Sequence, residues 1–477
     1  MRYRVLAAFC GAMPLAAFAT AAAQSTAPDT IRLSIEEAVA TGLKVADEVR
    51  LSAAQADVTE AQFGAARAGL LPVLKLSSTF GRTYYSARSL ALNPVFNQTN
   101  AYSVNLNFSQ TLFQGGKLYN TTIASNDLAK ASRLDSQEQR ALFTVQVQRA
   151  YLNALFANRM VELQETNLQL ATNRLTQVQQ FQAAGRSAQY DVLRAKVERA
   201  NIEPLAIQAR NDRDLAMLEV KRLINLPLDR PLVLTSVIDP NAAQMMVAAY
   251  LDSAAPPKRS ALASAELTAR ARRLAISAAR GDLLPTISVF FQGGYGAFPG
   301  AGLGVPTSRG YLSNSLCPAG SPATKTCQNG GWFNDASMGI NFTWNLFDGM
   351  RAVSGLEMAR AQTAIADVSL RQEQEQVSVE VAKARAELRR AKAVFDGSRE
   401  TSGEANEAFQ LASLRFSRGL STQLEVSDAQ LALLTAEGNE SRATYDLYLA
   451  TAELARALGR PIPLPATSAT PRRTSSK

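Results

Sequence analysis

Four segments of the chain alternate apolar and polar residues with the two-residue period of half-buried β-strands, at about 73–85, 102–113, 286–296 and 336–347. In the second of them, Val104, Leu106 and Phe108 fall on one face, and the asparagine and serine residues between them fall on the other. Each segment has about the ten residues of a tilted strand that crosses a bilayer. The pattern predicts either membrane-spanning strands or an ordinary antiparallel sheet in a soluble domain, because alternation alone does not separate the two.

The membrane interpretation has a consequence for assembly. Four strands are too few to close a barrel, and an open sheet edge is not tolerated in hydrocarbon, where no water satisfies the unpaired backbone groups. If these strands cross a membrane, several copies of the chain must share one barrel.

Long helical stretches alternate with the strand pairs. Residues 116–184 contain no proline and are rich in Ala, Leu, Gln, Arg and Glu, and a helix of this length reaches about 100 Å. The other long stretches are 187–223, 350–417 and 421–458. Shorter stretches at about 34–69 and 242–282 lead into the first strand of each pair. Pro204 predicts a kink or a break in its helix, because proline lacks the backbone N–H.

The chain is duplicated. QTLFQGGK around Phe113 recurs as WNLFDGMR around Phe347, and AAGRSAQYDVLRA around Gly185 recurs as SRGLSTQLEVSDA around Gly419. The offset is 234 in both cases (347 − 113 and 419 − 185). We therefore predict two structural repeats, at 24–233 and 234–461.

The offset changes upstream of these motifs. ARAGLLPV matches AARGDLLPT with Pro72 on Pro285, an offset of 213 (285 − 72). The second repeat therefore carries 21 extra residues (234 − 213) within the Gly- and Pro-rich stretch 296–331. Because this insertion lies between two strand-like segments, it predicts a longer loop at a hairpin tip.

Composition argues against an enzyme. The chain contains no histidine, which removes the usual general base and the commonest metal ligand. Acidic pairs occur on helix surfaces without an evident partner base. We expect no catalytic residues, no metal site and no cofactor.

The N-terminus has the three parts of a secretory signal peptide. Arg2 and Arg4 precede an apolar run at 5–18, and small residues ending at Ala23 follow. A membrane anchor is the alternative, but the run is short for a span and no other segment holds the roughly 20 apolar residues that a spanning helix needs. Cys10 follows the bulky Phe9, which argues against a lipoprotein. We predict that 1–23 is removed on export.

The two cysteines that remain are Cys317 and Cys327, which lie in the inserted loop. In an exported protein such a pair predicts a disulfide, with two free thiols as the alternative.

The formal net charge is +9, but basic and acidic residues alternate along the helical stretches without forming a patch with aromatics. This distribution indicates solvated helix faces rather than a nucleic-acid site. The Ser-, Thr-, Pro- and Arg-containing tail at 462–477 is predicted to be disordered.

The chain resembles the TolC-type outer-membrane factor family. The resemblance covers the whole mature chain and rests on LSIEEAVATGL at Leu33, the ARAGLLP step into a strand, the LFQGG and LFDG steps from strand to helix, the two AAGRSAQYDVL-like turns and the duplication. It implies a mixed α+β fold in which duplicated helical hairpins form a periplasmic tunnel. Four strands per chain would contribute to a twelve-stranded barrel shared by a homotrimer.

The resemblance also implies a function. The protein would be a passive exit channel in the outer membrane for a tripartite efflux pump or a type I secretion system. It would dock to a periplasmic adaptor and an inner-membrane transporter, and it would carry small molecules or polypeptides. The alternative is a periplasmic coiled-coil scaffold or adaptor that never enters a membrane, which strands of membrane length argue against.

The two short turns between long helices would form the periplasmic tip. Gly185 and Gly419 are placed to adopt the left-handed conformation that ends a helix, and Ser187 or Ser421 to cap the returning helix. By resemblance, the same turns contact the adaptor through these glycines and serines together with Arg186, Arg418 and Leu420.

Three acidic residues near the turns are candidates for a pore gate. Glu425 and Asp428 are three residues apart, so they share one helix face. By resemblance they face the pore, where copies from several chains form a ring that selects cations and binds blocking ones. Asp191 is the first-repeat equivalent of Glu425. The alternative is that these carboxylates only favour the first turns of their helices through the helix dipole.

Overall fold

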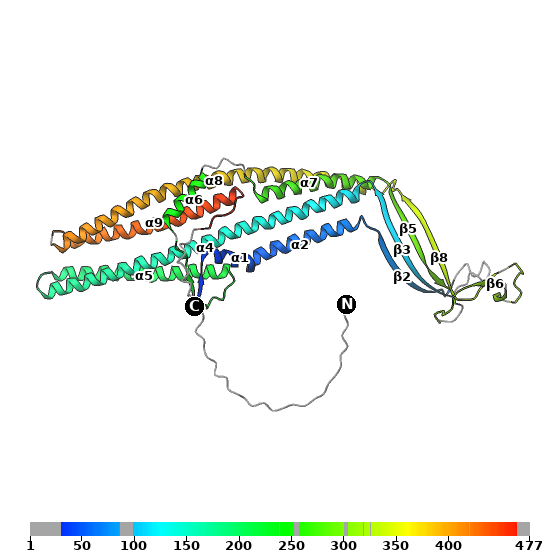
Figure 1. The fold of residues 1–477 in the computed structure, drawn as a ribbon, viewed down its shortest axis with the longest axis horizontal. Helices are drawn as coiled ribbons and strands as arrows, with labels where there is room; N and C mark the ends of the chain where they lie inside the picture. The colour runs from blue at the N-terminus through cyan, green and yellow to red at the C-terminus, as the bar shows by residue number, and fades with distance from the viewer. Residues whose placement is uncertain are drawn as a thin grey trace, which may run out of the picture.

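The computed structural model describes residues 30–85, 99–237, 239–251, 257–299, 304–317, 319–324, 326–418 and 420–464. Figure 1 shows an elongated molecule in which long helices continue at one end into a narrow sheet. The predicted signal peptide and residues 465–477 of the predicted disordered tail lie outside the described residues. Within the described part of the chain, no helix is both long enough and apolar enough to cross a membrane.

The four predicted strands are confirmed and form one antiparallel sheet. In spatial order it contains β2 (Val73–Arg82), β3 (Asn100–Gln114), β5 (Thr286–Ala297) and β8 (Trp332–Thr343). The predicted bounds of the last strand, 336–347, are displaced. β8 ends at Thr343 because its neighbour β5 begins at Thr286, which lies directly opposite.

The apolar face of the sheet is exposed. Cross-strand rows such as Leu74, Phe108, Phe291 and Met338 run over all four strands on this face. Met338 is 81% exposed in the single chain. At the end of the sheet far from the helices, Tyr102 stacks on Phe80 with ring centroids 4.8 Å apart and lies 6.5 Å from Trp332. An apolar band with an aromatic border is typical of strands in contact with lipid.

The four long helices are also confirmed. They are α4 (Lys117–Ala183), α5 (Gln189–Leu223), α8 (Arg351–Ser417) and α9 (Gln423–Ala457). The two shorter stretches are each divided into two helices, contrary to their prediction as single stretches. The four short helices are α1 (Ile35–Val45), α2 (Asp47–Ala68), α6 (Pro240–Leu251) and α7 (Ser260–Arg280). The first break is at Ala46, whose ψ of 131° is extended rather than helical.

The predicted break at Pro204 is wrong, because α5 runs through this residue from end to end. Pro204 and Ala200, whose carbonyl loses its N–H partner, both lie on the exposed side of the helix. The carbonyl that proline leaves unpaired can therefore bond to water, which removes the reason to break the helix.

Sheet and helices share one lateral order. α2 packs on α4, α4 on α7 and α7 on α8, in the same sequence as the strands β2-β3-β5-β8 that join them (Figure 1). Farther from the sheet, α4 pairs with α5, α8 pairs with α9, and α4 contacts α9. The open edges of the sheet, β2 and β8, therefore continue into the open edges of the helical layer, α2 and α8.

The structure reproduces the sequence repeat in detail. Val73 pairs with Ser109 in the first hairpin and Thr286 pairs with Thr343 in the second, which are equivalent positions under the offsets 213 and 234. The Gln110 Nε2 donates to the Leu70 carbonyl at 3.1 Å, and the equivalent Trp344 Nε1 donates to the Leu283 carbonyl at 3.3 Å.

One ion pair recurs with its charges reversed. Glu60 on α2 pairs with Arg133 on α4 at 2.9 Å, and the equivalent Arg273 on α7 pairs with Asp367 on α8 at 2.7 Å. The repeats thus keep the contact between their helices although they exchange the residues that make it.

A small second sheet holds the middle of the helical layer. β1 (Ile31–Leu33) and β4 (Leu232–Leu234) are parallel, and buried Tyr151 of α4 lies beneath them. The Tyr151 hydroxyl donates to the Leu33 carbonyl at 2.8 Å and accepts from the Ser236 N–H at 3.2 Å. Burial raises the pKa of Tyr151, so the hydroxyl stays neutral and able to donate.

Four charged side chains from α4, α8, α9 and the start of α7 form a cluster. Arg259, just before α7, bonds to Glu138 of α4 at 3.0 Å and to Glu380 of α8 at 2.5 Å. Arg456 of α9 contacts the same two carboxylates at 3.4 and 3.2 Å. Although burial alone would lower the pKa of Arg259, the carboxylates of Glu138 and Glu380 raise it. Two cations thus balance two anions, as a buried cluster requires, and they tie both repeats together.

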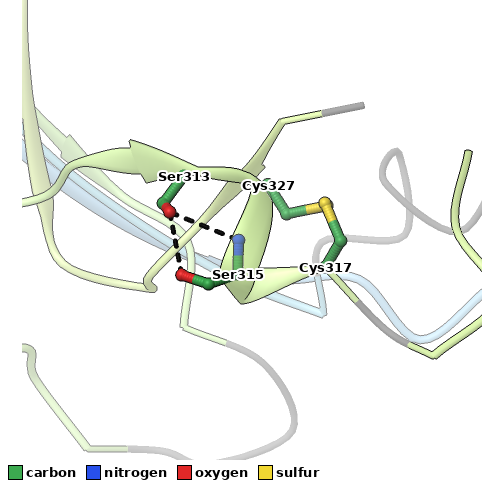
Figure 2. Close-up of a disulfide and its surroundings, with 4 residues drawn as sticks. All are labelled: Ser313, Ser315, Cys317 and Cys327. Atoms are coloured by element: carbon green, nitrogen blue, oxygen red, sulfur yellow. Dashed lines mark hydrogen bonds between the residues drawn. A yellow bond between two sulfur atoms is a disulfide. The ribbon is translucent and has the colours of Figure 1, made fainter. Parts of the chain in front are cut away.

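The 21 extra residues lie in the connection from β5 to β8. There β6 (Leu312–Ser313) pairs with β7 (Cys327–Gln328), and a disulfide joins Cys317 to Cys327. Figure 2 shows this disulfide beside a short turn in which the Ser313 hydroxyl accepts from the Ser315 N–H at 3.3 Å. The inserted loop is therefore folded and cross-linked at the end of the sheet far from the helices.

Candidate functional site

The turn from α4 to α5 ends its helix as the sequence predicts. Gly185 has a φ of +72°, which favours glycine, and the Arg186 N–H donates back to the Phe181 carbonyl at 2.8 Å. A Cβ on Gly185 would meet no described atom within 4 Å. Glycine is therefore needed at this position for its backbone conformation and not for space.

The turn from α8 to α9 makes the same bonds one repeat later. The Leu420 N–H donates to the Arg415 carbonyl at 2.8 Å, and the Arg418 N–H donates to the Leu414 carbonyl at 3.3 Å. Gly419 itself lies outside the described residues. Figure 1 shows that the two turns lie at the same end of the molecule, opposite the sheet.

The predicted serine caps are wrong by one residue. The N-cap positions are Ala188 and Thr422, and the Thr422 hydroxyl accepts from the Glu425 N–H at 3.4 Å. Ser187 instead donates its hydroxyl to Asp191 at 2.9 Å, and Ser421 donates to the Ala412 carbonyl at 3.4 Å. Both serines still lie in their turns, directly before the N-cap residues Ala188 and Thr422.

Two of the three acidic candidates bond within their own turns. Asp191 accepts from the Ala188 N–H at 3.1 Å, and Glu425 accepts from the Thr422 N–H at 3.5 Å. Both therefore support the start of a helix. Glu425 is nevertheless exposed, and Asp428, also exposed, faces a cavity between the two long hairpins. The capping bonds thus leave these carboxylates accessible to an ion.

This cavity has a volume of about 770 Å³ and lies between α4, α5 and α9. Its walls are mostly apolar, with single polar groups between them, including Gln164, Arg194 and Asp428. The Gln164 Oε1 is buried and has no hydrogen-bond partner among the described residues. The cavity is therefore a wet or partner-accepting cleft rather than a closed core.

A charged clasp bounds the cleft on the side of the turns. Arg174 of α4, only 12% exposed, bonds to Glu198 of α5 at 3.1 Å, and it also reaches α9. There its guanidinium donates to the Ser427 hydroxyl at 2.5 Å and to the Gln430 Oε1 at 3.0 Å. The Gln430 amide in turn donates to Asn167 of α4 at 2.6 Å. We refer to Arg174, Glu198, Ser427, Gln430 and Asn167 as the clasp.

An aromatic contact bounds the cleft at its other end. The Arg442 guanidinium of α9 lies 5.1 Å above the ring of Phe156 on α4, and Phe156 meets Tyr445 edge-on at 5.9 Å. Burial raises the pKa of Tyr445 to about 12. The two hairpins also touch through Arg159 of α4 and Glu437 of α9 at 3.4 Å, but the clasp lies closer to the turns than these contacts.

The clasp is the part of the site that the sequence did not predict. Arg174 stands in an ordinary polar helical run, and its partner Ser427 is 253 residues away. In the described part of the chain, no group of three or more acidic, cysteine or histidine side chains is placed to hold a metal ion.

Solved structures share this fold. A membrane protein from Pseudomonas aeruginosa has a TM-score of 0.67 at 21% identity, covering 89% of this chain and 92% of its own. The outer membrane protein VceC from Vibrio cholerae has a TM-score of 0.68 at 18% identity, with coverages of 90% and 97%. The open state of the MtrE outer membrane channel from Neisseria gonorrhoeae has a TM-score of 0.64 at 20% identity, with 89% coverage of both chains.

A search of curated proteins finds no significant match. The sequence model of the outer membrane efflux proteins, a family of transport proteins, matches both repeats. It covers residues 43–226 and 253–460, and the chain therefore belongs to the outer membrane efflux protein family.

Proposed function

We propose that this outer-membrane exit channel works as a homotrimer that receives its cargo from a periplasmic adaptor and an inner-membrane transporter. Small molecules and polypeptides are both suitable cargo for such a duct. The observation that carries the proposal is that the sheet and the helical layer of one chain are open at the same two edges, β2 with α2 and β8 with α8.

Shared edges favour a closed ring of copies. In hydrocarbon, the backbone groups along β2 and β8 need partners, and the β8 edge of one copy can supply them to the β2 edge of the next. A head-to-tail contact of this kind closes when the rotation between copies allows it. Three copies of four strands give twelve, the barrel that the family resemblance implies, and the exposed apolar face would then meet lipid.

The turns at the other end are proposed to close the tunnel and to dock the adaptor. In a ring of three copies, Glu425 and Asp428 would place six carboxylates around one constriction, with Asp191 nearby on the first hairpin. Exposed Arg186, Arg418 and Leu420 border these turns and offer charged and apolar contacts to a partner. The clasp would hold the two hairpins of each copy together, and separating them would widen the tunnel.

The channel function can be tested in planar bilayers. We expect the purified trimer to give discrete cation-selective openings that multivalent cations block, because carboxylate rings attract and hold cations. Glu425→Gln combined with Asp428→Asn should abolish the block. Block that persists in this variant would overturn the gate assignment. A wild-type protein that stays in solution without detergent and gives no conductance would overturn the channel function itself.

The clasp can be tested in the same recordings. Arg174→Ala removes charge-assisted hydrogen bonds worth about 2 kcal/mol, which should raise the ratio of open to closed channels roughly 30-fold. Arg199→Ala is the matched control, because among the described residues the ion pair of Arg199 is an exposed one with Glu203 on the same helix. An open probability that is the same in both variants would show that the clasp does not restrain opening.

Docking at the turns can be tested by export. Gly185→Val with Gly419→Val should reduce export in cells while trimers still form, because valine disfavours the left-handed conformation that Gly185 adopts and that the sequence repeat predicts for Gly419. Gly397→Val with Gly403→Val is the control, since both positions are exposed in α8 with open space around them. Export at the control level in the turn variant would contradict docking at this end.

A further inference from the structure

The cleft between the two hairpins has the size and shape of a small-molecule site. Its volume of about 770 Å³ lies within the range of pockets that hold drug-sized ligands, about 300–1,000 Å³. Asp428 and Arg442 line it 14 residues apart on α9 (442 − 428), about 21 Å along the helix axis. The clasp bounds one end and the contact of Arg442 with Phe156 bounds the other. A compact, elongated molecule fits such a cleft, whereas a long partner helix would have to displace one of these contacts.

The walls of the cleft are apolar on both hairpins. The α4–α5 hairpin contributes Met160, Val197 and Leu205, and α9 contributes Leu431 and Leu434. In the single chain, Val197 is 59% exposed and Leu431 is 62% exposed. A ligand that covers these side chains removes their apolar surface from water. The walls therefore favour a ligand with an apolar body.

One buried acceptor in the cleft is unused. The Gln164 Oε1 is buried and has no hydrogen-bond partner among the described residues. The Thr435 hydroxyl, which also lines the cleft, already donates to the Leu431 carbonyl at 2.8 Å. A buried acceptor without a partner is costly, and a donor group on a ligand removes that cost. Gln164 therefore favours a ligand that carries an N–H or O–H group.

The charges in the cleft select among such ligands. Asp428 lines the cleft and, among the described residues, makes no ion pair, whereas Glu198 is paired with Arg174 in the clasp. At the far end, the face of Phe156 already holds the guanidinium of Arg442, so it accepts a cation. Arg194, the first-repeat equivalent of Asp428 (428 − 194 = 234), opposes a ligand that is positive along its whole length. A free carboxylate and a free carbonyl together favour a single protonated amine.

We propose that the cleft binds an elongated amphipathic amine, one copy in each chain, and that this ligand holds the two hairpins together. Its apolar body lies between the walls of α5 and α9, and its amine donates to Asp428 or to Gln164. The regulatory part of the inference rests on the proposed function, because it requires that separating the hairpins opens a channel.

The coupling follows from where the walls come from. α4 and α5 belong to one hairpin and α9 belongs to the other, and the two hairpins lie side by side (Figure 1). A ligand that touches both walls finds its full set of contacts only while the hairpins are packed. It therefore shifts the equilibrium toward the closed arrangement by its difference in affinity for the two states. The ligand acts in the same direction as the clasp, but through different residues.

Binding can be measured on the purified protein in lipid discs with dansylcadaverine as the probe. This molecule joins an aromatic ring system to a primary amine through an alkyl chain, and its fluorescence rises in apolar surroundings. Its N-acetyl derivative is uncharged and its N-succinyl derivative carries a carboxylate, so the series varies the charge on one body. We expect the amine to bind most tightly and the carboxylate most weakly.

Variants locate the probe. Gln164→Leu should raise its Kd about fivefold, and Asp428→Asn should raise it about tenfold, because each removes one acceptor for the amine. Thr435→Trp should abolish binding by filling the cleft. Gln169→Leu and Asp212→Asn are the matched controls, since both residues are exposed and neither lines the cleft.

The effect on opening can be measured in planar bilayers. We expect dansylcadaverine to make openings less frequent without shortening them, because it stabilises the closed arrangement. An amine that plugged the carboxylate ring would instead shorten each opening. Gln164→Leu should need about a fivefold higher concentration of the probe for the same reduction.

The outcomes separate this inference from the proposed function. Equal binding of all three probes, or tightest binding of the carboxylate, would overturn the ligand class. Unchanged binding in both Gln164→Leu and Thr435→Trp would place the probe elsewhere and overturn the site. A conducting channel that binds no amine would overturn this inference alone. Binding without any conductance in the wild-type protein would support the site, but it would overturn the proposed function and the regulatory role with it.

Discussion

Backbone hydrogen bonding along two sheet edges is the constraint on which the rest of this structure depends. Among the described residues, β2 and β8 each pair with a strand of the sheet on one side only, and the apolar face of the sheet is open to the surroundings. In water such a sheet would be a site of aggregation, and in lipid each unpaired backbone group costs several kcal/mol. A ring of copies removes both problems at once. Because each strand is joined to a helix at the same end of the sheet, α2, α4, α7 or α8, closing the sheet into a ring also brings the helices into a ring.

Because the chain is duplicated, a ring of copies contains two kinds of contact. One joins the two repeats inside a chain and the other joins neighbouring copies, and different residues form them. Inside each chain, the two repeats are joined by β3 with β5, by ion pairs between α4 and α7, and by the cluster of Glu138, Arg259, Glu380 and Arg456. Arg259 corresponds to Ala46 in the first repeat, so this cluster has no counterpart at the contact between copies. Several contacts within one chain therefore join the two repeats near the sheet. The places left to move are the contacts between copies and the cleft between the hairpins, which the clasp closes.

Local periodicity was enough to predict the strands and the long helices. The alternation in β3 and the uninterrupted helical composition of α4 identify both elements within two or three residues of their ends, because each pattern is set by neighbours in sequence. The constant offset of 234 likewise anticipated that Gly185 and Leu420 belong to equivalent turns. Errors arose where a partner decides the outcome. β8 ends where β5 begins, and Pro204 is tolerated because its side of α5 faces water.

In the candidate site too, features set by neighbouring residues were predictable and features set by distant partners were not. Asp191 and Glu425 could be placed at the start of helices from the sequence, since capping is local. The clasp could not, because Arg174 meets Ser427 only after two separate hairpins pack, and nothing near Arg174 in the sequence marks it. The parallel pair of β1 and β4 was missed for a similar reason, since each strand has only three residues and their pairing depends on Tyr151 beneath them.

The mass of the detergent-extracted protein, measured under native conditions, tests the central claim most directly. A ring that satisfies both edges has a fixed number of copies, so the account predicts a single species of three chains with neither a dimer nor larger open assemblies. A stable monomer would show that one chain satisfies its own sheet edges. A ladder of increasing copy number would show that the head-to-tail contact does not close, and either result would contradict the account.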